Sequence, residues 1–236
     1  MHDGLLEVTV SRTWHLAKGY RAVELRAKQG VSLPPFDEGA ILDVVLDAHA
    51  NRSRSQPLHR ESSRRETYVV GVRTRSASRF EARPDDAIFY PGSELLIRPP
   101  MSLPLAIDEH ARYILFAGGL GVATIAGIAR RLADAKKSFE LHHFAQSTAR
   151  TLLREELQAL APFGKVHHHV GLGAHEIAQT VSHAVSPSNA NAQIYCSGPP
   201  KLMDLIQLNA HEWVYPKNVH KIYLGDWKGP AGTAQV

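Results

Sequence analysis

The chain has 236 residues, a length suited to two domains of about 100–150 residues each. An apolar share of 44% with 21% charged residues excludes a disordered or fibrous protein. The single cysteine, Cys196, excludes an internal disulfide framework and a four-thiolate iron–sulfur or zinc site within this sequence.

The first hundred residues contain short runs rich in Val, Leu and Ile, several of which alternate with polar residues. Pro, Gly and Asp separate these runs, which is typical of strands in a small antiparallel barrel or sandwich. The expected strands span residues 5–11, 21–28, 41–47, 67–73 and 94–99.

The net charge is +4, and basic residues are concentrated in NRSRSQPLHRESSRRE at residues 51–66. Aromatic residues are not interleaved with these cations and no nucleic-acid-binding module is recognisable, so nucleic acid is not an expected partner. The stretch is either a solvated loop or a site for a ligand phosphate or an acidic partner protein.

The pattern changes after Pro104, where apolar strands alternate with helical segments. This alternation predicts a parallel sheet with right-handed crossovers, in which ligands bind outside the carboxyl ends of the strands. Residues 229–236 are expected to be a disordered tail, and Ser147 is the expected N-cap of the second helix. We expect strands at 112–117, 139–144, 165–170 and 193–197, and helices near 122–134, 147–160, 174–185 and 200–213.

Two glycine-containing turns fall at these strand ends, GGLG at residues 118–121 and SGPP at 197–200. The stretch from Gly119 reads G-x-G-x-x-T, which lacks the third glycine of the dinucleotide-binding fingerprint, and no acidic residue ends the next strand. Glycines still let the backbone approach a phosphate, and the following helix offers N–H groups and a positive dipole. From these residues alone the first turn is either a phosphate cradle or a packing turn, and Cys196 is expected to be an inert strand residue.

Longer stretches resemble, in order and spacing, the phthalate dioxygenase reductase-like family of the ferredoxin–NADP reductase superfamily. The resemblance implies an antiparallel six-stranded flavin-type β-barrel over residues 1–107, followed by an NAD(P)H-binding α/β domain with a parallel sheet over 108–228. It covers residues 5 to about 226 and rests on five stretches, YILFAGGLGVATIAGIARRL, SFELHHFAQSTARTLLREEL, IYCSGPPKLMD, LPPFDEGAILDVVL and PGSELLIRPPMSLPL.

The resemblance implies that NADH or NADPH binds at the strand ends of the second domain. Ser197, which stands where the family has a cysteine near the nicotinamide, is the candidate catalytic residue. Gln146 replaces an arginine of the family, and Val122-Ala123-Thr124 replaces its I-T-P. The candidate nucleotide-binding residues carried over from the family are Gly118, Gly119, Gly121, Thr124, Ser147, Gly198 and Pro199.

The flavin-binding motif departs further from the family. The family's R-x-Y-S aligns with Arg54-Ser55-Gln56-Pro57, so only Arg54 is retained. Pro57 has no N–H and no hydroxyl with which to contact flavin N5. Arg73 and Ser78 are the further candidates for holding the phosphate of FMN or FAD.

Two functions therefore remain open. The first is a flavin-dependent NAD(P)H oxidoreductase that passes electrons to a separate ferredoxin or Rieske-type oxygenase subunit, with the basic loop 60–65 as a docking site for an acidic ferredoxin. The second is an accessory or binding subunit of the same fold that has lost flavin and hydride-transfer activity. The ferredoxin domain that many of these reductases append is not in this sequence.

Other classes of protein are not expected. No signal-peptide pattern and no apolar stretch of roughly 20 residues is visible, so a cytoplasmic protein without a membrane partner is expected. A hydrolase is not expected because the sequence has no G-x-S-x-G elbow. Among the histidines only His167 and His169 share a face of their strand, while His142 and His143 point to opposite faces. We expect no carboxylate at ligand spacing beside them, so no metal site is predicted.

Overall fold

The computed structural model describes residues 4–29, 31–47, 49–59, 67–74, 88–105 and 107–228, and the chain divides into two compact units. The first unit extends to Leu103 and also contains the segment that begins at Leu224. The second unit runs from Pro104 to Tyr223. The segment after Leu224, which we expected within a second domain of 108–228, joins the first unit because its strand pairs with a strand of that unit.

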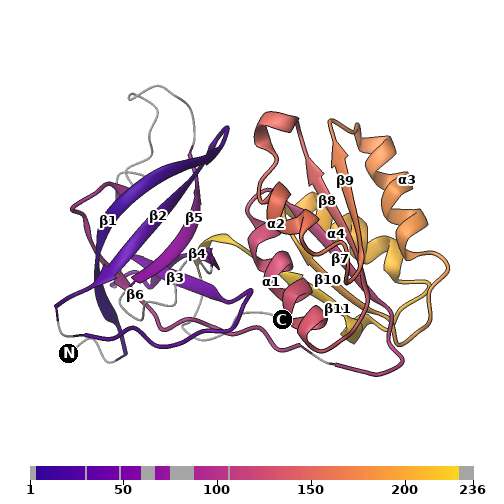
Figure 1. Ribbon diagram of the computed structural model, residues 1–236, viewed down its shortest axis with the longest axis horizontal. Helices are drawn as coiled ribbons and strands as arrows, with labels where there is room; N and C mark the ends of the chain where they lie inside the picture. The colour runs from indigo at the N-terminus through magenta and orange to yellow at the C-terminus, as the bar shows by residue number, and fades with distance from the viewer. Residues whose placement is uncertain are drawn as a thin grey trace. The chain divides into compact units, whose positions relative to one another are not determined.

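The first unit is an antiparallel β-barrel (Figure 1). Its strands are β1 (Leu6–Ala17), β2 (Tyr20–Ala27), β3 (Ile41–Asp47), β4 (Arg52–His59), β5 (Thr67–Arg73), β6 (Glu94–Ile97) and β12 (Gly225–Lys228). The order of hydrogen-bonded neighbours is β12-β4-β3-β6-β1-β2-β5. Pairing of Leu58 with Val70 and of His59 with Val69 joins β4 to β5. This closes a ring of six strands, as expected, with β12 added beside β4.

The interior of the barrel is filled by the apolar residues that alternate along its strands. Val8 and Val10 of β1 share this core with Val23 and Leu25 of β2, and each is at most 1% exposed. Because side chains of a strand point alternately to its two faces, the polar residues between them point to the other face, where Glu24 is covered by Ser11 and Arg12. The alternation in the sequence therefore predicts the buried face of these strands correctly.

Strand β4 corrects one interpretation of the basic stretch. Residues 52–59 are not a solvated loop, because they pair with β3 on one side and with β12 on the other. Ser53 and Gln56 are each only 4% exposed. Two buried polar residues interrupt the apolar alternation that marks the other strands. Arg60, Arg64, Arg65, Ser78 and the tail 229–236 lie outside the described residues.

The second unit is a five-stranded parallel sheet flanked by helices, which confirms the expected fold class (Figure 1). The strands, in the spatial order β11-β10-β7-β8-β9, are β7 (Tyr113–Gly118), β8 (Phe139–Ala145), β9 (Lys165–Val170), β10 (Gln193–Ser197) and β11 (Val219–Ile222). The helices are α1 (Gly121–Asp134), α2 (Arg154–Gln158), α3 (Ala174–Val185) and α4 (Pro200–Ala210), with short 3-10 turns at Thr148–Arg150 and Pro216–Asn218.

Helices cover both faces of this sheet, so its central strand β7 is buried along its whole length. Ile114 and Phe116 of β7 share a buried cluster with residues of α3 and α4. Helix α1 lies against the other side of β7 (Figure 1). Among the described residues, no helix combines the length and apolar character needed to cross a bilayer.

The expected helix over residues 147–160 is wrong. Ser147 precedes only a 3-10 turn and makes no side-chain cap hydrogen bond within the described chain. Thr151 is extended and Leu153 is left-handed with φ 51°, so helix α2 begins only at Arg154. Leu152 and Leu157 are both buried, yet residues five apart on a continuous helix point about 140° apart. The break in the helix lets both leucines reach the core.

Candidate functional site

The carboxyl ends of β7 and β10 lie side by side, because the two strands pair in parallel with Ser197 opposite Ala117. The turns that follow them therefore meet. A Cβ atom on Gly118 would lie 2.9 Å from Cδ of Pro199, and one on Gly198 would lie 3.1 Å from Cα of Gly118. Packing between the turns thus accounts for glycine at both positions.

Gly121, the first residue of α1, has even less space. A Cβ atom here would lie 2.2 Å from the carbonyl oxygen of Ser197. Ser197 is 1% exposed, and its hydroxyl donates a hydrogen bond of 2.9 Å to the carbonyl of Ile222. Ser197 therefore links β10 to β11 and supports the first turn of α1, while its hydroxyl already has a backbone partner.

Two helices begin at this edge of the sheet without a side-chain cap. The residues before them, Leu120 for α1 and Pro199 for α4, make no side-chain cap hydrogen bond in the described part of the chain. Gly119 has φ +55°, the left-handed region that glycine adopts most readily. The uncapped N-terminus of α1 offers backbone N–H groups and partial positive charge, which together favour a bound phosphate. Helix α4 begins at Pro200 directly after Pro199, neither of which has an N–H, so it contributes its dipole. The arrangement fits the pyrophosphate of a nicotinamide nucleotide.

Ser147 and Thr124 occupy different environments. Ser147 follows β8 at the same carboxyl edge and is half-buried. Its carbonyl accepts hydrogen bonds from the Arg150 N–H at 3.0 Å and from the Thr151 hydroxyl at 3.2 Å. Thr124 is fully buried on α1, and its hydroxyl has no hydrogen-bond partner among the described residues.

The candidate flavin contacts lie on β4 in the first unit. Nε of Arg54 donates to Oδ1 of Asp226 on β12 at 2.5 Å, and these side chains are 11% and 42% exposed. The hydroxyl of Ser55 donates to Oδ1 of Asp43 at 2.6 Å. Gln56 and Pro57 are buried. Arg73 is exposed at the end of β5, and Ser78 is outside the described residues.

These contacts test how well the described residues fit a flavin. Arg54 provides a cation, but the Asp226 carboxylate pairs with it and would repel a flavin phosphate. Pro57 lies opposite Ile41 in the β3–β4 ladder and has no hydrogen to donate to flavin N5. Among the described residues, the fit to a flavin is therefore limited to cations for its phosphate.

Asp226 was not among the candidate residues from the sequence. It lies 172 residues from Arg54, and only the pairing of β12 with β4 brings the two side chains together. No local pattern in the sequence signals such a contact.

Cys196 matches its expected structural role. The residue is fully buried in β10, and burial raises the pKa of its thiol to about 12. Since the thiolate is the reactive form, this cysteine is chemically inert in the fold.

No protein-family model matches the sequence, although individual known proteins do. The chain is 30% identical over 200 residues to tetrachlorobenzoquinone reductase of Sphingobium chlorophenolicum, covering 84% of the chain and 61% of that protein. It is 29% identical over 215 residues to phthalate dioxygenase reductase of Burkholderia cepacia, covering 89% of the chain and 65% of that protein. The chain thus spans less than two thirds of the length of these relatives.

The fold is similar to a solved structure of phthalate dioxygenase reductase. The TM-score is 0.72 at 26% identity, and the match covers 99% of the chain and 71% of that protein. That structure is described as modular, for electron transfer from pyridine nucleotides to a [2Fe–2S] centre.

Proposed function

The chain belongs to the phthalate dioxygenase reductase-like family of the ferredoxin–NADP reductase superfamily, and we propose that it is an NAD(P)H-dependent flavoprotein reductase. Its reaction would take a hydride from NADH or NADPH and pass electrons to a separate iron–sulfur protein. The observation that carries this proposal is the pair of glycine turns at the carboxyl edge, with two uncapped helix N-termini behind them.

Each group at this edge has a proposed part in binding the nucleotide. The backbone of Gly118, Gly119 and Gly198 and the first turn of α1 would hold the phosphates, and the dipole of α4 would add partial positive charge. Ser147 would approach the adenosine ribose. Gly121 and Ser197 act as positioning residues, because their contact sets where the first turn of α1 begins.

FMN or FAD, when bound to the barrel, would supply the conversion of a two-electron hydride into single electrons. Arg54 and Arg73 are the described cations available for its phosphate. The acceptor would be a ferredoxin or a Rieske-type oxygenase subunit, a proposal that the name of the phthalate dioxygenase relative supports. We place this activity in the cytoplasm, where NAD(P)H is available.

One observation favours a second function. The Arg54–Asp226 pair and Pro57 remove the flavin contacts that the family uses, as expected for an accessory subunit that no longer binds flavin. The two functions differ in a property that is simple to measure.

The test is flavin binding by the purified chain. The protein is examined for flavin absorbance as isolated and then titrated with FMN and with FAD. Saturable uptake of one flavin per chain is expected for the reductase. A colourless protein that takes up neither flavin contradicts the reductase and favours the accessory subunit.

A further inference from the structure

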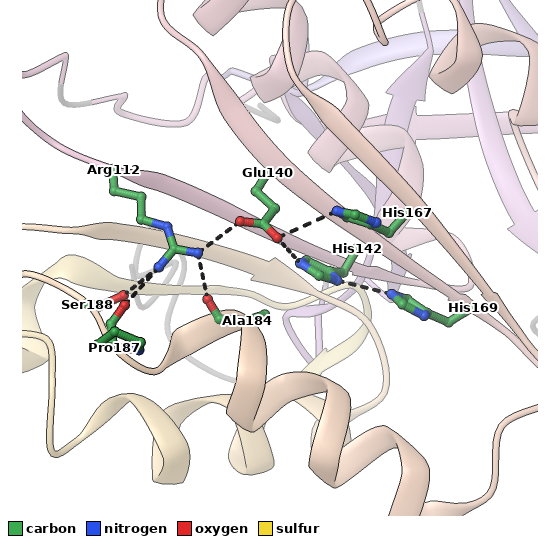
Figure 2. A network of polar contacts seen from close by, with 8 residues as sticks. All are labelled: Arg112, Glu140, His142, His167, His169, Ala184, Pro187 and Ser188. Atoms are coloured by element: carbon green, nitrogen blue, oxygen red, sulfur yellow. Dashed lines mark hydrogen bonds and ion pairs between the residues drawn. The ribbon is translucent and has the colours of Figure 1, made fainter.

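A cluster of imidazole and carboxylate groups lies between β8 and β9, apart from the proposed nucleotide edge. Glu140 and His142 share a face of β8, and His167 and His169 share a face of β9. The parallel register places His142 opposite His167. Figure 2 shows the side chains of Glu140, His142 and His167 directed toward one another. The expectation that no carboxylate accompanies the histidines is wrong, because Glu140 lies two residues before His142 on the same strand.

The spacing of the three groups suits a metal ion. Oε1 of Glu140 lies 3.3 Å from Nε2 of His142 and 3.5 Å from Nε2 of His167. The three ligand atoms all lie within 4.8 Å of one another. Tetrahedral zinc with bonds near 2.0–2.1 Å separates neighbouring ligand atoms by about 3.4 Å. The two separations from Glu140 match those of a zinc site, and the two imidazole nitrogens, which lie within 4.8 Å of each other, would move closer together around a bound ion.

The nitrogens that point into the cluster lie at ion-pair distance from Oε1 of Glu140 but do not form a hydrogen bond of good geometry with it. Nε2 of His142 and Nε2 of His167 are both buried atoms without a hydrogen-bond partner among the described residues. The side chain of His142 is only 6% exposed. Burying a polar nitrogen without a partner is costly, and such atoms are rare in native proteins. A cation between the three groups would give both nitrogens and the carboxylate a common partner.

Surrounding contacts hold the ligands in this orientation. Nδ1 of His142 is hydrogen-bonded to Nε2 of His169 at 3.0 Å, which leaves Nε2 of His142 for a ligand (Figure 2). Arg112 donates to Oε2 of Glu140 at 2.8 Å, which leaves Oε1 directed at the histidines. Ligating histidines and carboxylates in metal sites have outer partners of this kind.

The site is also accessible from solvent. The side chain of His167 is 42% exposed, which provides a path for an ion.

Ring stacking is a simpler explanation of part of the cluster. The rings of His142 and His167 stack with centroids 4.8 Å apart, and His142 also stacks on Phe116 at 5.3 Å. Stacking accounts for how the rings pack between the strands. It does not account for two buried Nε2 atoms that face the same carboxylate oxygen.

We propose that Glu140, His142 and His167 form a binding site for a divalent transition-metal ion, with zinc the metal best suited to two imidazoles and one carboxylate. Three protein ligands leave a fourth position for water. The ion would join β8 to the edge strand β9. This site is independent of the proposed reductase function.

The test uses the full chain without a polyhistidine tag, stripped with a chelator and titrated with Zn²⁺ by calorimetry. Co²⁺ is titrated in parallel, since its visible ligand-field bands report four-coordinate geometry. We expect one equivalent of Zn²⁺ to bind and to raise the thermal unfolding midpoint. The midpoint of His167→Gln should not respond to Zn²⁺.

His167→Gln is the main variant because His167 is partly exposed and its replacement should preserve folding. It should bind Zn²⁺ at least tenfold more weakly and lose the Co²⁺ bands. The matched control is His168→Gln, the next residue of β9, which points to the other face and should bind as the unaltered chain does. His169→Leu, which removes the partner of His142, should weaken binding by about tenfold. Absence of one-equivalent binding, or binding retained in His167→Gln or lost in His168→Gln, overturns the proposal.

Discussion

At residue 121 the chain has room only for glycine, because any Cβ atom would meet the carbonyl group of Ser197. The same serine is hydrogen-bonded to Ile222, so a shift of its backbone would disturb β10 and β11 together. Gly121 thus connects the first turn of α1 to β10, the strand that precedes the glycine turn at residues 197–200. The position of the proposed phosphate site depends on this contact.

The first prediction follows from this contact. Gly121→Ala should lower the free energy of unfolding by about 1–3 kcal/mol, the usual cost of overpacking a buried site. Gly173→Ala is the control without overpacking, because its Cβ would lie 3.4 Å from the nearest atom; it should cost less than Gly121→Ala, about 0.5–1 kcal/mol, because alanine is a poorer N-cap than glycine. Urea unfolding measures both variants. Equal stability of the two would contradict the role of the Gly121–Ser197 contact.

The second prediction concerns Asp226. If Arg54 serves the flavin phosphate, Asp226→Asn should tighten the binding of FMN or FAD, because it removes a negative charge beside the phosphate. Arg54→Gln should weaken binding. Asp47→Asn, which removes the charge of a half-buried carboxylate of β3 whose partners are the N–H groups of His49 and Ala50, is the control. Quenching of flavin fluorescence gives the affinities, and weaker binding by Asp226→Asn would exclude this role for Arg54.

The third prediction concerns how the free energy of unfolding depends on pH, and it rests on His220. His220 stacks on Tyr195 at 4.4 Å between ring centroids and is hydrogen-bonded to Oε1 of Gln193, and burial lowers its pKa. A lowered pKa in the folded state means that the unfolded chain takes up this proton first, so stability falls as the pH drops below about 6.5. His220→Gln should show a shallower loss of unfolding free energy between pH 7 and pH 5. An unchanged slope would show that His220 does not contribute.

Among the secondary-structure elements, α1 ends at a position where a lysine adopts a backbone conformation that favours glycine. Lys136 follows the helix with φ +57°, its N–H donates to the carbonyl of Ala133, and the N–H of Lys137 donates to that of Leu132. This is a Schellman motif, in which the left-handed position is usually glycine. Lysine therefore occupies a strained conformation in an otherwise regular helix end.

The fourth prediction is that Lys136→Gly stabilises the second unit. The gain should be about 1 kcal/mol, because glycine adopts the left-handed conformation without a Cβ clash. Lys137 does not have a positive φ, so Lys137→Gly relieves no backbone strain and should leave the stability of the protein unchanged or lower it. Thermal unfolding of the two variants provides the comparison. A loss of stability in Lys136→Gly would contradict the assignment of strain.

The elements differ in how far the sequence predicts them, for physical reasons. β9, β10 and α3 have the expected bounds, because continuous strand runs and helical periodicity mark them directly. β4 escapes prediction because its buried positions include Ser53 and Gln56, which break the apolar alternation. The helix over 147–160 fails because Leu153 takes a left-handed conformation that no local pattern requires.

The candidate site is likewise predictable only where a local sequence pattern marks it. The two glycine turns are visible in the sequence. The alternation of strands with helices predicts a parallel sheet and so places both turns at its carboxyl edge. The contact between Gly121 and Ser197 depends on the register of β7 with β10, which local patterns do not specify. The Arg54–Asp226 pair depends on the return of the chain to the barrel after β11. Glu140 was overlooked although its two-residue spacing from His142 was visible.

At the scale of the whole molecule, two units each have their own buried core and distinct proposed tasks. The second unit has the features expected of a nucleotide-binding domain, with glycine turns and helix N-termini at one edge. The first unit has the barrel of the family but altered residues on β4. We propose that the two units perform electron transfer from NAD(P)H despite these altered residues.

The most direct test is the reduction of an artificial electron-acceptor dye by NADH or NADPH, with the purified chain preincubated with FMN or FAD. If the chain is a flavoprotein reductase, we expect catalytic turnover that depends on both the chain and one flavin, with preference for one nicotinamide nucleotide. Gly198→Val should raise the KM for that nucleotide, because the larger side chain disturbs the proposed phosphate site. Absence of turnover with every combination of flavin and nucleotide would contradict the account.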